Sequence, residues 1–501
     1  MSPPPGLWEL VRRRAEAAPD ALLAVDETDR RLGFAEYRAA SERCAAALAA
    51  RGVGEGTPVS WVLPTWLEAL VLVGALARLG ARQNPILPIY REREVGFITR
   101  QSGAQFLIVP RVWRGFDYAA LARSVAGETD GLDVLVVDRA LPEGDPAALP
   151  PPPVADGTEA PVRWLFYTSG TTADPKGALH TDASLGAAAE GMAAALALRD
   201  DDRVAFVFPL THVGGIVWLL AALRVGCGLI AVEAFDPRAS IDVLARHGVT
   251  QGTAGTVFHQ AYLAAGRGRG GERLFPAVRA FPGGGAPKPP DLHFAVKREL
   301  GGAGIVSGWG MTECPIVTMN RVGDADAHLA HTEGCPTPGM QLRVVDGELR
   351  VKGPQLFRGY LDAALDAAAF DAAGWFRTGD LGSVGPEGHV TITGRLKDVI
   401  IRKGENISAK EVEDLLHRHP RVSEAAVIGL PDPETGERCC AVVACREPES
   451  APDLADVTGF LRAQGLAPQK LPERLELVES LPRNPTGKVL KRDLQLRYGK
   501  V

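Results

Sequence analysis

The stretch from Tyr167 to Leu179 reads YTSGTTADPKGAL, and its residue types suit an anionic ligand. Glycine lets backbone N–H groups converge and the Thr and Ser hydroxyls add donors, so such a loop can surround a polyphosphate. A Walker loop is excluded, because its lysine is followed by a magnesium-binding hydroxyl residue, whereas Gly177 follows Lys176 here. A phosphate-binding loop and a plain solvated turn are the two interpretations left.

The composition indicates a large globular protein that acts on small molecules. The chain has 501 residues, of which 46% are hydrophobic and 23% charged, enough for several packed subdomains. The formal charge is −6 with both signs interspersed, which argues against a nucleic-acid partner or an anionic membrane surface. The seven cysteines are scattered without metal-ligand spacing, so we interpret them as reduced structural thiols.

The amino-terminal stretch MSPPPGLWELVRRRAEAAPD lacks the apolar core of a secretory peptide, and no apolar run is long enough to span a membrane. A cytoplasmic location is expected. The abundance of Ala, Gly, Arg and Pro is typical of proteins from G+C-rich bacterial genomes.

Short apolar runs alternate with amphipathic runs in the first two thirds of the chain. The patterns predict helices at 34–52 and 66–80 and strands at 59–64, 105–110, 132–137 and 203–209. Similar alternation extends to about residue 339. This pattern predicts a layered α/β structure with mostly parallel sheets, built from several subdomains.

A different pattern begins after residue 339. The stretches 341–353 and 388–395 are predicted to form antiparallel strands. Helices are predicted at 410–417 and 457–465, and strands at 422–432 and 439–445. The chain is therefore expected to divide into a large domain, 1–393, and a small α+β carboxy-terminal domain, 394–501.

Eight stretches, taken together and in order, resemble the adenylate-forming (AMP-binding) superfamily, which contains acyl-CoA synthetases, peptide-synthetase adenylation domains and luciferases. Besides the opening loop they are THVGG (211–215), GGGAP (283–287), GWGMTE (308–313), GWFRTGDLG (374–382), GRLKD (394–398), RKGENISAKEVE (402–413) and LPRNPTGKVLKRDL (481–494). The resemblance covers essentially the whole chain. It implies an adenylate-forming enzyme fold that uses ATP, Mg²⁺ and coenzyme A.

The resemblance also implies a nucleotide site. The β- and γ-phosphates are expected to be held by Thr168, Ser169, Gly170, Thr171 and Thr172, with Lys176 supporting either the loop or a phosphate. The adenine is expected to be enclosed by Gly284, Gly285, Ala286, Pro287, Trp309, Gly310 and Met311. Thr312 is expected to contact the α-phosphate, Glu313 to ligate Mg²⁺, Asp380 to bind the ribose hydroxyls and Arg395 to contact the nucleotide. Lys488 is the expected catalytic lysine, which reaches the α-phosphate and the substrate carboxylate.

Each of these residues also has an ordinary interpretation when it is taken alone. Trp309 could be a core aromatic, and Glu313 a carboxylate at the start of a helix. Asp380 could stabilise an Asx turn, and Lys488 could be a solvated surface lysine. The order of the eight stretches favours the nucleotide site.

In this family the second half-reaction is attack of a thiol on the acyl-adenylate. It needs a rearrangement of the protein. The resemblance implies that the small domain rotates about the hinge residue Lys397 after adenylation. The loop of Lys403, Gly404 and Glu405 would then face the pantetheine arm of CoA. A polar hairpin turn is the alternative interpretation of this loop.

The expected acyl pocket comprises His212, Val213, Gly214, Gly215 and Gly308. Amino-acid-activating relatives commonly carry an aspartate near this position, and its absence disfavours an amino-acid substrate. The small and apolar residues predict a roomy pocket for a hydrophobic, even alicyclic, acid. Similarity to cyclohexanecarboxylate-type and medium-chain acyl-CoA ligases points the same way. His212 resembles a catalytic histidine that borders the acyl pocket and thiol tunnel of such ligases, although a core histidine is the other interpretation.

The sequence therefore predicts an AMP-forming acyl-CoA ligase. Ala173 replaces a glycine that is usual in the loop, which leaves open a homologue that performs only one half-reaction. A ligase that loads the phosphopantetheine of a carrier protein and a nucleotide-binding homologue without turnover are further alternatives. Assembly as a homodimer is also left open.

Overall fold

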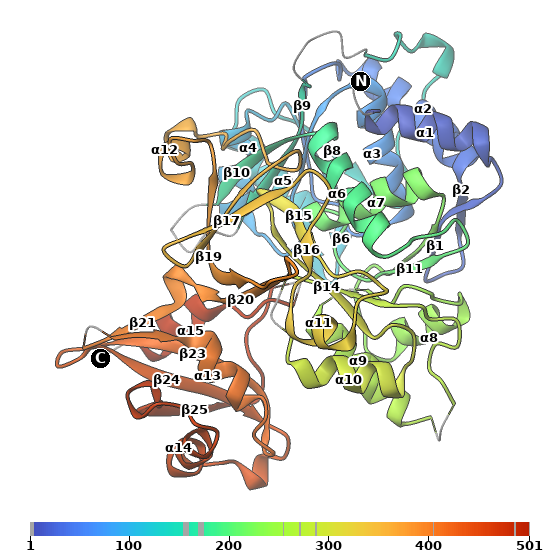
Figure 1. Ribbon diagram of the computed structural model, residues 1–501. Helices are drawn as coiled ribbons and strands as arrows, with labels where there is room; N and C mark the ends of the chain where they lie inside the picture. The colour runs from blue at the N-terminus through green and yellow to red at the C-terminus, as the bar shows by residue number, and fades with distance from the viewer. Residues whose placement is uncertain are drawn as a thin grey trace.

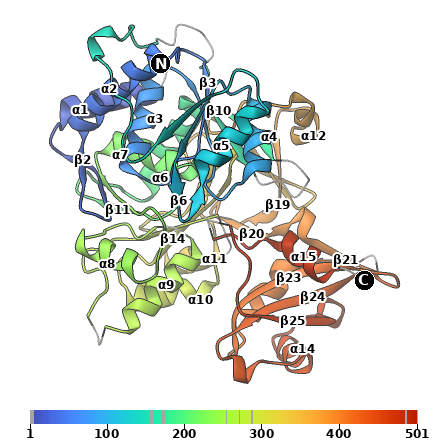
Figure 2. The same ribbon diagram turned by 180° about the vertical axis from the view of Figure 1, so that it is seen from behind.

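The computed structural model describes residues 5–153, 160–168, 175–253, 255–269, 272–285, 288–403, 405–484 and 487–499. The elements up to β20 form a large lobe, and those from β21 onward gather in a smaller lobe beside it (Figures 1 and 2). No helix within these ranges is both long and apolar enough to cross a lipid bilayer.

A six-stranded sheet forms one layer of the large lobe, in the order β10-β9-β4-β3-β5-β8. Its strands are β3 (Pro58–Trp61), β4 (Arg82–Pro85), β5 (Phe106–Pro110), β8 (Asp133–Val137), β9 (Val162–Thr168) and β10 (Lys176–Thr181). All neighbours are parallel except the β9–β10 hairpin. The predicted strands at 59–64, 105–110 and 132–137 are confirmed.

Helices cover both faces of this sheet. They include α2 (Phe34–Ala50), α3 (Leu67–Leu79), α4 (Glu92–Ser102) and α5 (Tyr118–Gly127), and the first two confirm the predicted helices. In β5, Leu107 and Val109 pack with the residues of α4 and α5, whereas Phe106 and Ile108 pack with the core that contains α3. Burial on both faces explains why this strand is apolar without alternation.

A second sheet has the order β11-β12-β1-β2. It comprises β1 (Leu22–Asp26), β2 (Arg31–Gly33), β11 (Arg203–Phe206) and β12 (Gly228–Ala231). β11, β12 and β1 are parallel, and α7 (Val213–Val225) connects β11 to β12. Helices α1 (Leu7–Ala17) and α6 (Asp182–Ala195) belong to the same core.

The third sheet corrects one prediction. It comprises β13 (Phe281–Gly283), β14 (Ile305–Met311), β15 (Cys314–Met319) and β16 (Cys335–Pro336), with helices α8 (Ala239–Arg246), α9 (Thr256–Arg267), α10 (Pro290–Glu299) and α11 (Asp326–His331) nearby in the chain. Only β13 and β14 are parallel, because β14 turns directly into an antiparallel β15 through Thr312 and Glu313. Such a short connection cannot join parallel strands, so the alternation expected up to residue 339 is wrong here.

A fourth, antiparallel sheet has the order β17-β18-β19-β20. Its strands are β17 (Gln341–Val345), β18 (Glu348–Lys352), β19 (Phe376–Val384) and β20 (Val390–Arg395). The sequence pattern predicted β17, β18 and β20 but not β19. Asp346 and Gly347 both have positive φ in the two-residue turn between β17 and β18. A two-residue hairpin turn of this handedness favours Asp-Gly, and it fixes the register of the two strands.

The smaller lobe has its own apolar core. It comprises β21 (Val399–Arg402), β22 (Glu405–Ser408), α13 (Ala409–Leu416), β23 (Val422–Asp432), β24 (Gly436–Cys445), α14 (Leu454–Ala463), β25 (Arg474–Val478) and α15 (Lys491–Tyr498). Ile392 packs against the core of the fourth sheet, whereas Ile400 belongs to the core of the smaller lobe. The chain thus passes between the two cores at the short 3-10 helix Leu396–Asp398.

Candidate active site

The two ends of the opening loop lie on β9 and β10, which pair with each other. Thr168 ends β9 and pairs with Lys176, the first residue of β10. The predicted phosphate-binding residues Ser169, Gly170, Thr171 and Thr172, and Ala173 with them, lie outside the described residues. The Lys176 ammonium lies 5.6 Å from the centre of the Tyr360 ring. The structure therefore places the two ends of the loop beside the Tyr360 segment.

Tyr360 links the hairpin to Glu313, and the sequence reasoning missed it. Its hydroxyl donates a hydrogen bond to Glu313 Oε1 at 2.7 Å. Burial raises the pKa of Tyr360, and the Glu313 carboxylate raises it further, so the phenol keeps the proton that it donates. The segment after it is held by the Leu361 N–H, which donates to the Gly177 carbonyl at 2.8 Å. Its sequence signal was only a tyrosine after Gly359, in a stretch that the eight motifs do not include.

The Thr312–Glu313 turn depends on a glycine and on a buried histidine. A Cβ on Gly310 would lie 1.9 Å from the Pro315 carbonyl oxygen, so this close approach requires glycine. His180 Nε2 lies 2.8 Å from the Thr312 carbonyl oxygen. Because a carbonyl only accepts, Nε2 carries the proton, and burial lowers the pKa of His180 to about 4. His180, also missed from the sequence, is thus a neutral donor that holds the turn in place.

Residues from three separate motifs meet at one buried carboxylate, that of Asp380. Trp309 donates from its indole Nε1 to Asp380 Oδ2 at 2.8 Å. Arg395, which faces Asp380 across the β19–β20 pair, places its Nε 2.6 Å from Oδ1. Asp380 is only 2% exposed, so its charge is compensated inside the protein.

The glycines at the start of GGGAP lie against β14, the strand that carries Trp309. A Cβ on Gly284 would lie 3.0 Å from the Gly308 carbonyl oxygen, so the backbones of the two segments approach closely. Gly285 has φ of +75°. Ala286 and Pro287 lie outside the described residues. The described glycines therefore flank the strand that carries Trp309 and Met311.

Lys488 comes to this region from the smaller lobe. A Cβ on the preceding residue, Gly487, would lie 3.3 Å from Val257 Cγ2 on α9, so the lysine loop rests on the large lobe. Burial at this junction, and next the charges of Arg395 and Lys397, lower the pKa of Lys488 to about 8, although solvent still reaches its side chain. Burial also lowers the pKa of Lys397. Lys488 and Lys397 therefore lie on the Arg395 side of the site.

The loop expected to meet CoA lies elsewhere. Lys403 has φ of +51° at the tip of the β21–β22 hairpin, and its N–H donates to the Thr435 carbonyl at 2.8 Å. Gly404 lies outside the described residues, and Glu405 is exposed. Both views show this tip at the far side of the smaller lobe from β14 (Figures 1 and 2). The structure does not bring Lys403 and Glu405 to Thr312.

A small cavity of about 20 Å³ adjoins Thr312 and His212, so the structure does not show the roomy pocket that the sequence predicted. It is lined by Pro85, Ile86, Leu87, Tyr90, Phe166, Tyr167, Thr211, His212, Val213 and Thr312. The lining joins the predicted pocket residues His212 and Val213 to the stretch that follows β4, which contributes Ile86, Leu87 and Tyr90. No side chain in this lining is a carboxylate, an ammonium or a guanidinium.

His212 caps the amino-terminal end of α7. Its Nδ1 accepts a hydrogen bond from the Gly214 N–H at 3.1 Å, and burial lowers the pKa of His212 to about 4. The ring is therefore neutral, with its proton on Nε2.

Close packing of the backbone explains why residues 215 and 308 are glycines. A Cβ on Gly215 would lie 2.6 Å from the Leu210 carbonyl oxygen, and one on Gly308 would lie 2.7 Å from that of Thr318. In both places two backbone segments approach too closely for any larger residue. The cavity lining shows no contribution from these glycines.

Residues 11–361 match the AMP-binding enzyme family, and residues 411–488 match the AMP-binding enzyme C-terminal domain. The medium-chain fatty-acid–CoA ligase of Escherichia coli is 29% identical over 97% of this chain and 90% of its own. A salicyl-AMP ligase / salicyl-S-ArCP synthetase of Mycobacterium tuberculosis is 33% identical over 96% of this chain and 88% of its own.

Among solved structures, ATP-bound MatB from Rhodopseudomonas palustris superposes with a TM-score of 0.86 at 28% identity, covering 98% of this chain and 99% of its own. The predicted α/β fold, with a large domain and a smaller carboxy-terminal one, is confirmed. The chain belongs to the AMP-binding enzyme family, and it is an AMP-forming acyl-CoA ligase.

Proposed function

We propose that this ligase activates a hydrophobic carboxylic acid, which it holds in the cavity beside Thr312 and His212. The observation that supports the proposal most strongly is the cavity lining, which is apolar or uncharged throughout. A charged substrate tail would lose its hydration there without gaining a partner, whereas an apolar tail gains from burial. The cavity also reaches Thr312, beside the expected position of the α-phosphate. Its volume of about 20 Å³ has room for about one water, so its side chains must move apart when the acid binds.

In the first step, a carboxylate oxygen of the acid attacks the α-phosphorus of ATP. An acyl–phosphate bond forms, the bond to the β-phosphate oxygen breaks, and pyrophosphate leaves. We assign Lys488 and the Thr312 hydroxyl to the charge that develops on the α-phosphate. Asp380 and Arg395 would hold the ribose side of the nucleotide, and Trp309 with Gly284 and Gly285 the adenine.

Glu313 fits the role of magnesium ligand. Its Oε1 accepts from Tyr360, and its Oε2 has no protein partner among the residues that the structure describes. A carboxylate is a ligand that Mg²⁺ prefers, and Mg²⁺ neutralises phosphate charge when bound. The tyrosine bond would keep the carboxylate oriented toward the phosphates.

In the second step, the CoA thiol attacks the acyl carbonyl, the thioester bond forms and AMP leaves with its electron pair, while the thiol proton goes to solvent. His212 is neutral and its Nδ1 is already occupied, so we assign its Nε2–H a donor role toward the substrate rather than the role of a base. Because the Lys403–Glu405 hairpin lies away from Thr312, this step requires the smaller lobe to rotate. Lys397 lies between the two apolar cores, where such a hinge belongs.

An assay against a panel of acids, with separate readouts for adenylate and thioester, tests this proposal. We expect pyrophosphate exchange and CoA thioester formation with medium-chain or alicyclic acids, and neither with amino acids. Pyrophosphate exchange only with amino acids, or with other acids that carry a second charge in the tail, would overturn the assignment of the pocket.

The acceptor is tested by running the same assay with CoA alone and with an acyl carrier protein. We expect thioester with CoA alone, and acylation of the carrier only would show that this enzyme loads carrier proteins. Since ATP and free CoA are cytoplasmic substrates, we also propose a cytoplasmic location.

A further inference from the structure

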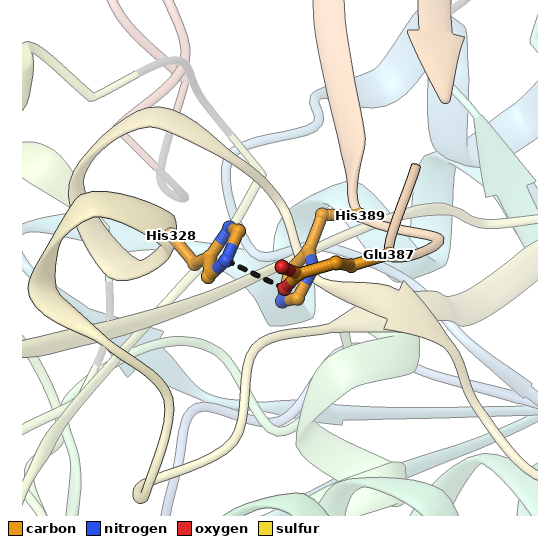
Figure 3. Close-up of side chains that lie close together, drawn as sticks. All are labelled: His328, Glu387 and His389. Atoms are coloured by element: carbon orange, nitrogen blue, oxygen red, sulfur yellow. Dashed lines mark ion pairs between the residues drawn. The ribbon is translucent and has the colours of Figure 1, made fainter. Parts of the chain in front are cut away.

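Three side chains with metal-ligating atoms meet away from the nucleotide site. His328 lies on α11, and Glu387 and His389 lie in the turn that joins β19 to β20 (Figure 3). One ligand atom from each lies within 4.8 Å of the other two. His328 Nε2 lies 3.0 Å from Glu387 Oε2, and the two imidazole rings stack at 3.8 Å with 6° between their planes.

His389 lacks hydrogen-bond partners in this arrangement. Both of its ring nitrogens are buried, and neither has a partner among the described residues. Asp324 Oδ2 lies 3.6 Å from Nε2, which is too distant for a hydrogen bond. Leaving an imidazole buried and unpaired destabilises a protein, so the site needs a further group to satisfy it.

The types of ligand atom indicate which metal ion the site would bind. Two imidazole nitrogens and one carboxylate suit a divalent zinc-type ion, whereas Mg²⁺ and Ca²⁺ prefer oxygen ligands alone. Cys335 is close by, since its Sγ lies 3.6 Å from the Glu387 carbonyl oxygen. Its Sγ is not among the ligand atoms that gather within 4.8 Å of one another, so Cys335 is a neighbour of the site.

We propose that His328, Glu387 and His389 bind one Zn²⁺-type ion as a structural site, distinct from the magnesium position at Glu313. Asp324 is placed to approach as a fourth ligand or to orient His389. Small rotations of the side chains would bring the three ligand atoms to bonding distance from one ion, and both His389 and Glu387 would then be satisfied.

The position of the site indicates what the ion would do. The turn and the α11 segment are already joined by two backbone hydrogen bonds, from the Glu333 N–H to the Val390 carbonyl at 2.8 Å and from the Val390 N–H to the Gly334 carbonyl at 2.9 Å. The ion would add a stronger link at this joint. Because β19 carries Asp380 and β20 carries Arg395, the link would fix the strand pair that forms the ribose side of the nucleotide site.

The test uses the full-length protein without an affinity tag, first treated with a chelator and then titrated with ZnSO₄ by calorimetry and with CoCl₂ by visible absorption. We expect one Zn²⁺ per chain, a higher thermal midpoint with the ion, and a cobalt spectrum of nitrogen–oxygen ligation. His328→Ala and His389→Ala should each weaken binding by at least about 100-fold, since even the loss of an outer partner costs 10–100-fold.

His331→Ala is the matched control, because His331 is an exposed histidine at the end of the same helix. It should bind Zn²⁺ as the wild type does. Glu387→Gln keeps the shape of the turn and should weaken binding at least about tenfold, which guards against a fold defect in the histidine variants. If the His328→Ala/His389→Ala double variant bound Zn²⁺ as tightly as the wild type, or if the wild type took up none, the site would be refuted. This outcome is independent of the acid that the ligase uses.

Discussion

Lys488→Ala is expected to lower the rate of acyl-adenylate formation by about 10²–10³-fold, the usual cost of removing one donor from a developing oxyanion. The lysine loop rests on α9 through Gly487, and the Lys488 charge lies on the Arg395 side of the nucleotide site. Pyrophosphate exchange measures this step directly. Thioester formation from synthetic acyl-adenylate and CoA should stay close to the wild-type rate, because the proposed rotation withdraws the lysine before this step.

Lys470→Ala is the matched control for this variant, since Lys470 is in the same lobe and forms a surface ion pair with Glu411. It should leave both half-reactions unchanged. Equal adenylation by Lys488→Ala and wild type would refute the assignment of the catalytic lysine.

The pH dependence of adenylation provides a second readout of Lys488. Lysine is cationic below its pKa, and that of Lys488 is lowered to about 8, so kcat/KM for adenylation should fall as the pH rises through about 8. Lys488→Arg keeps a cation at every accessible pH, so any residual activity should lose this alkaline limb. His212, with a pKa of about 4, should add no limb near neutral pH.

Asp380→Ala is expected to raise the KM for ATP at least about tenfold and to lower the thermal midpoint of the protein. Asp380 Oδ2 accepts from the Trp309 indole, and the carboxylate forms an ion pair with Arg395, whose Nε lies 2.6 Å from Oδ1. Removing the carboxylate leaves an indole N–H and a guanidinium without their partner. We expect a loss of about 2 kcal/mol, below the cost for a fully buried pair because Arg395 is partly exposed.

Trp309→Phe is the companion variant. It keeps an aromatic ring and the Asp380–Arg395 pair and removes only the indole donor, so its effect on stability should be about 1 kcal/mol. The two are compared by thermal unfolding and by ATP titration. Wild-type ATP affinity in Asp380→Ala would contradict the placement of the ribose at this carboxylate.

The fold was predictable wherever one residue pattern dominates a segment. The run at 105–110 indicates a strand buried on both faces, and Asp346–Gly347 marks a hairpin turn, so both could be predicted without tertiary contacts. The β14–β15 hairpin was not predicted, because its turn residues Thr312 and Glu313 are chosen by chemistry and not by turn propensity.

The motifs of the site could be predicted from the sequence, but the residues that hold those motifs in place could not. Trp309, Asp380 and Arg395 meet as their motifs implied, whereas His180 and Tyr360 hold Thr312 and Glu313 through contacts between distant segments. The same limit applies to His328, Glu387 and His389, since α11 and the β19–β20 turn come together only in the folded chain. Single histidines and carboxylates at such separations carry no spacing signal.

The central claim is that the acid passes through an acyl-adenylate and that AMP leaves when CoA attacks. It is tested most directly by supplying an accepted acid whose carboxylate carries a heavy oxygen isotope, with ATP and CoA, and by analysing the products by mass spectrometry. The account predicts that one heavy oxygen atom appears in AMP for each acyl-CoA formed, because that oxygen bonds to the α-phosphorus. Heavy oxygen in inorganic phosphate, with ADP as the nucleotide product, would contradict it.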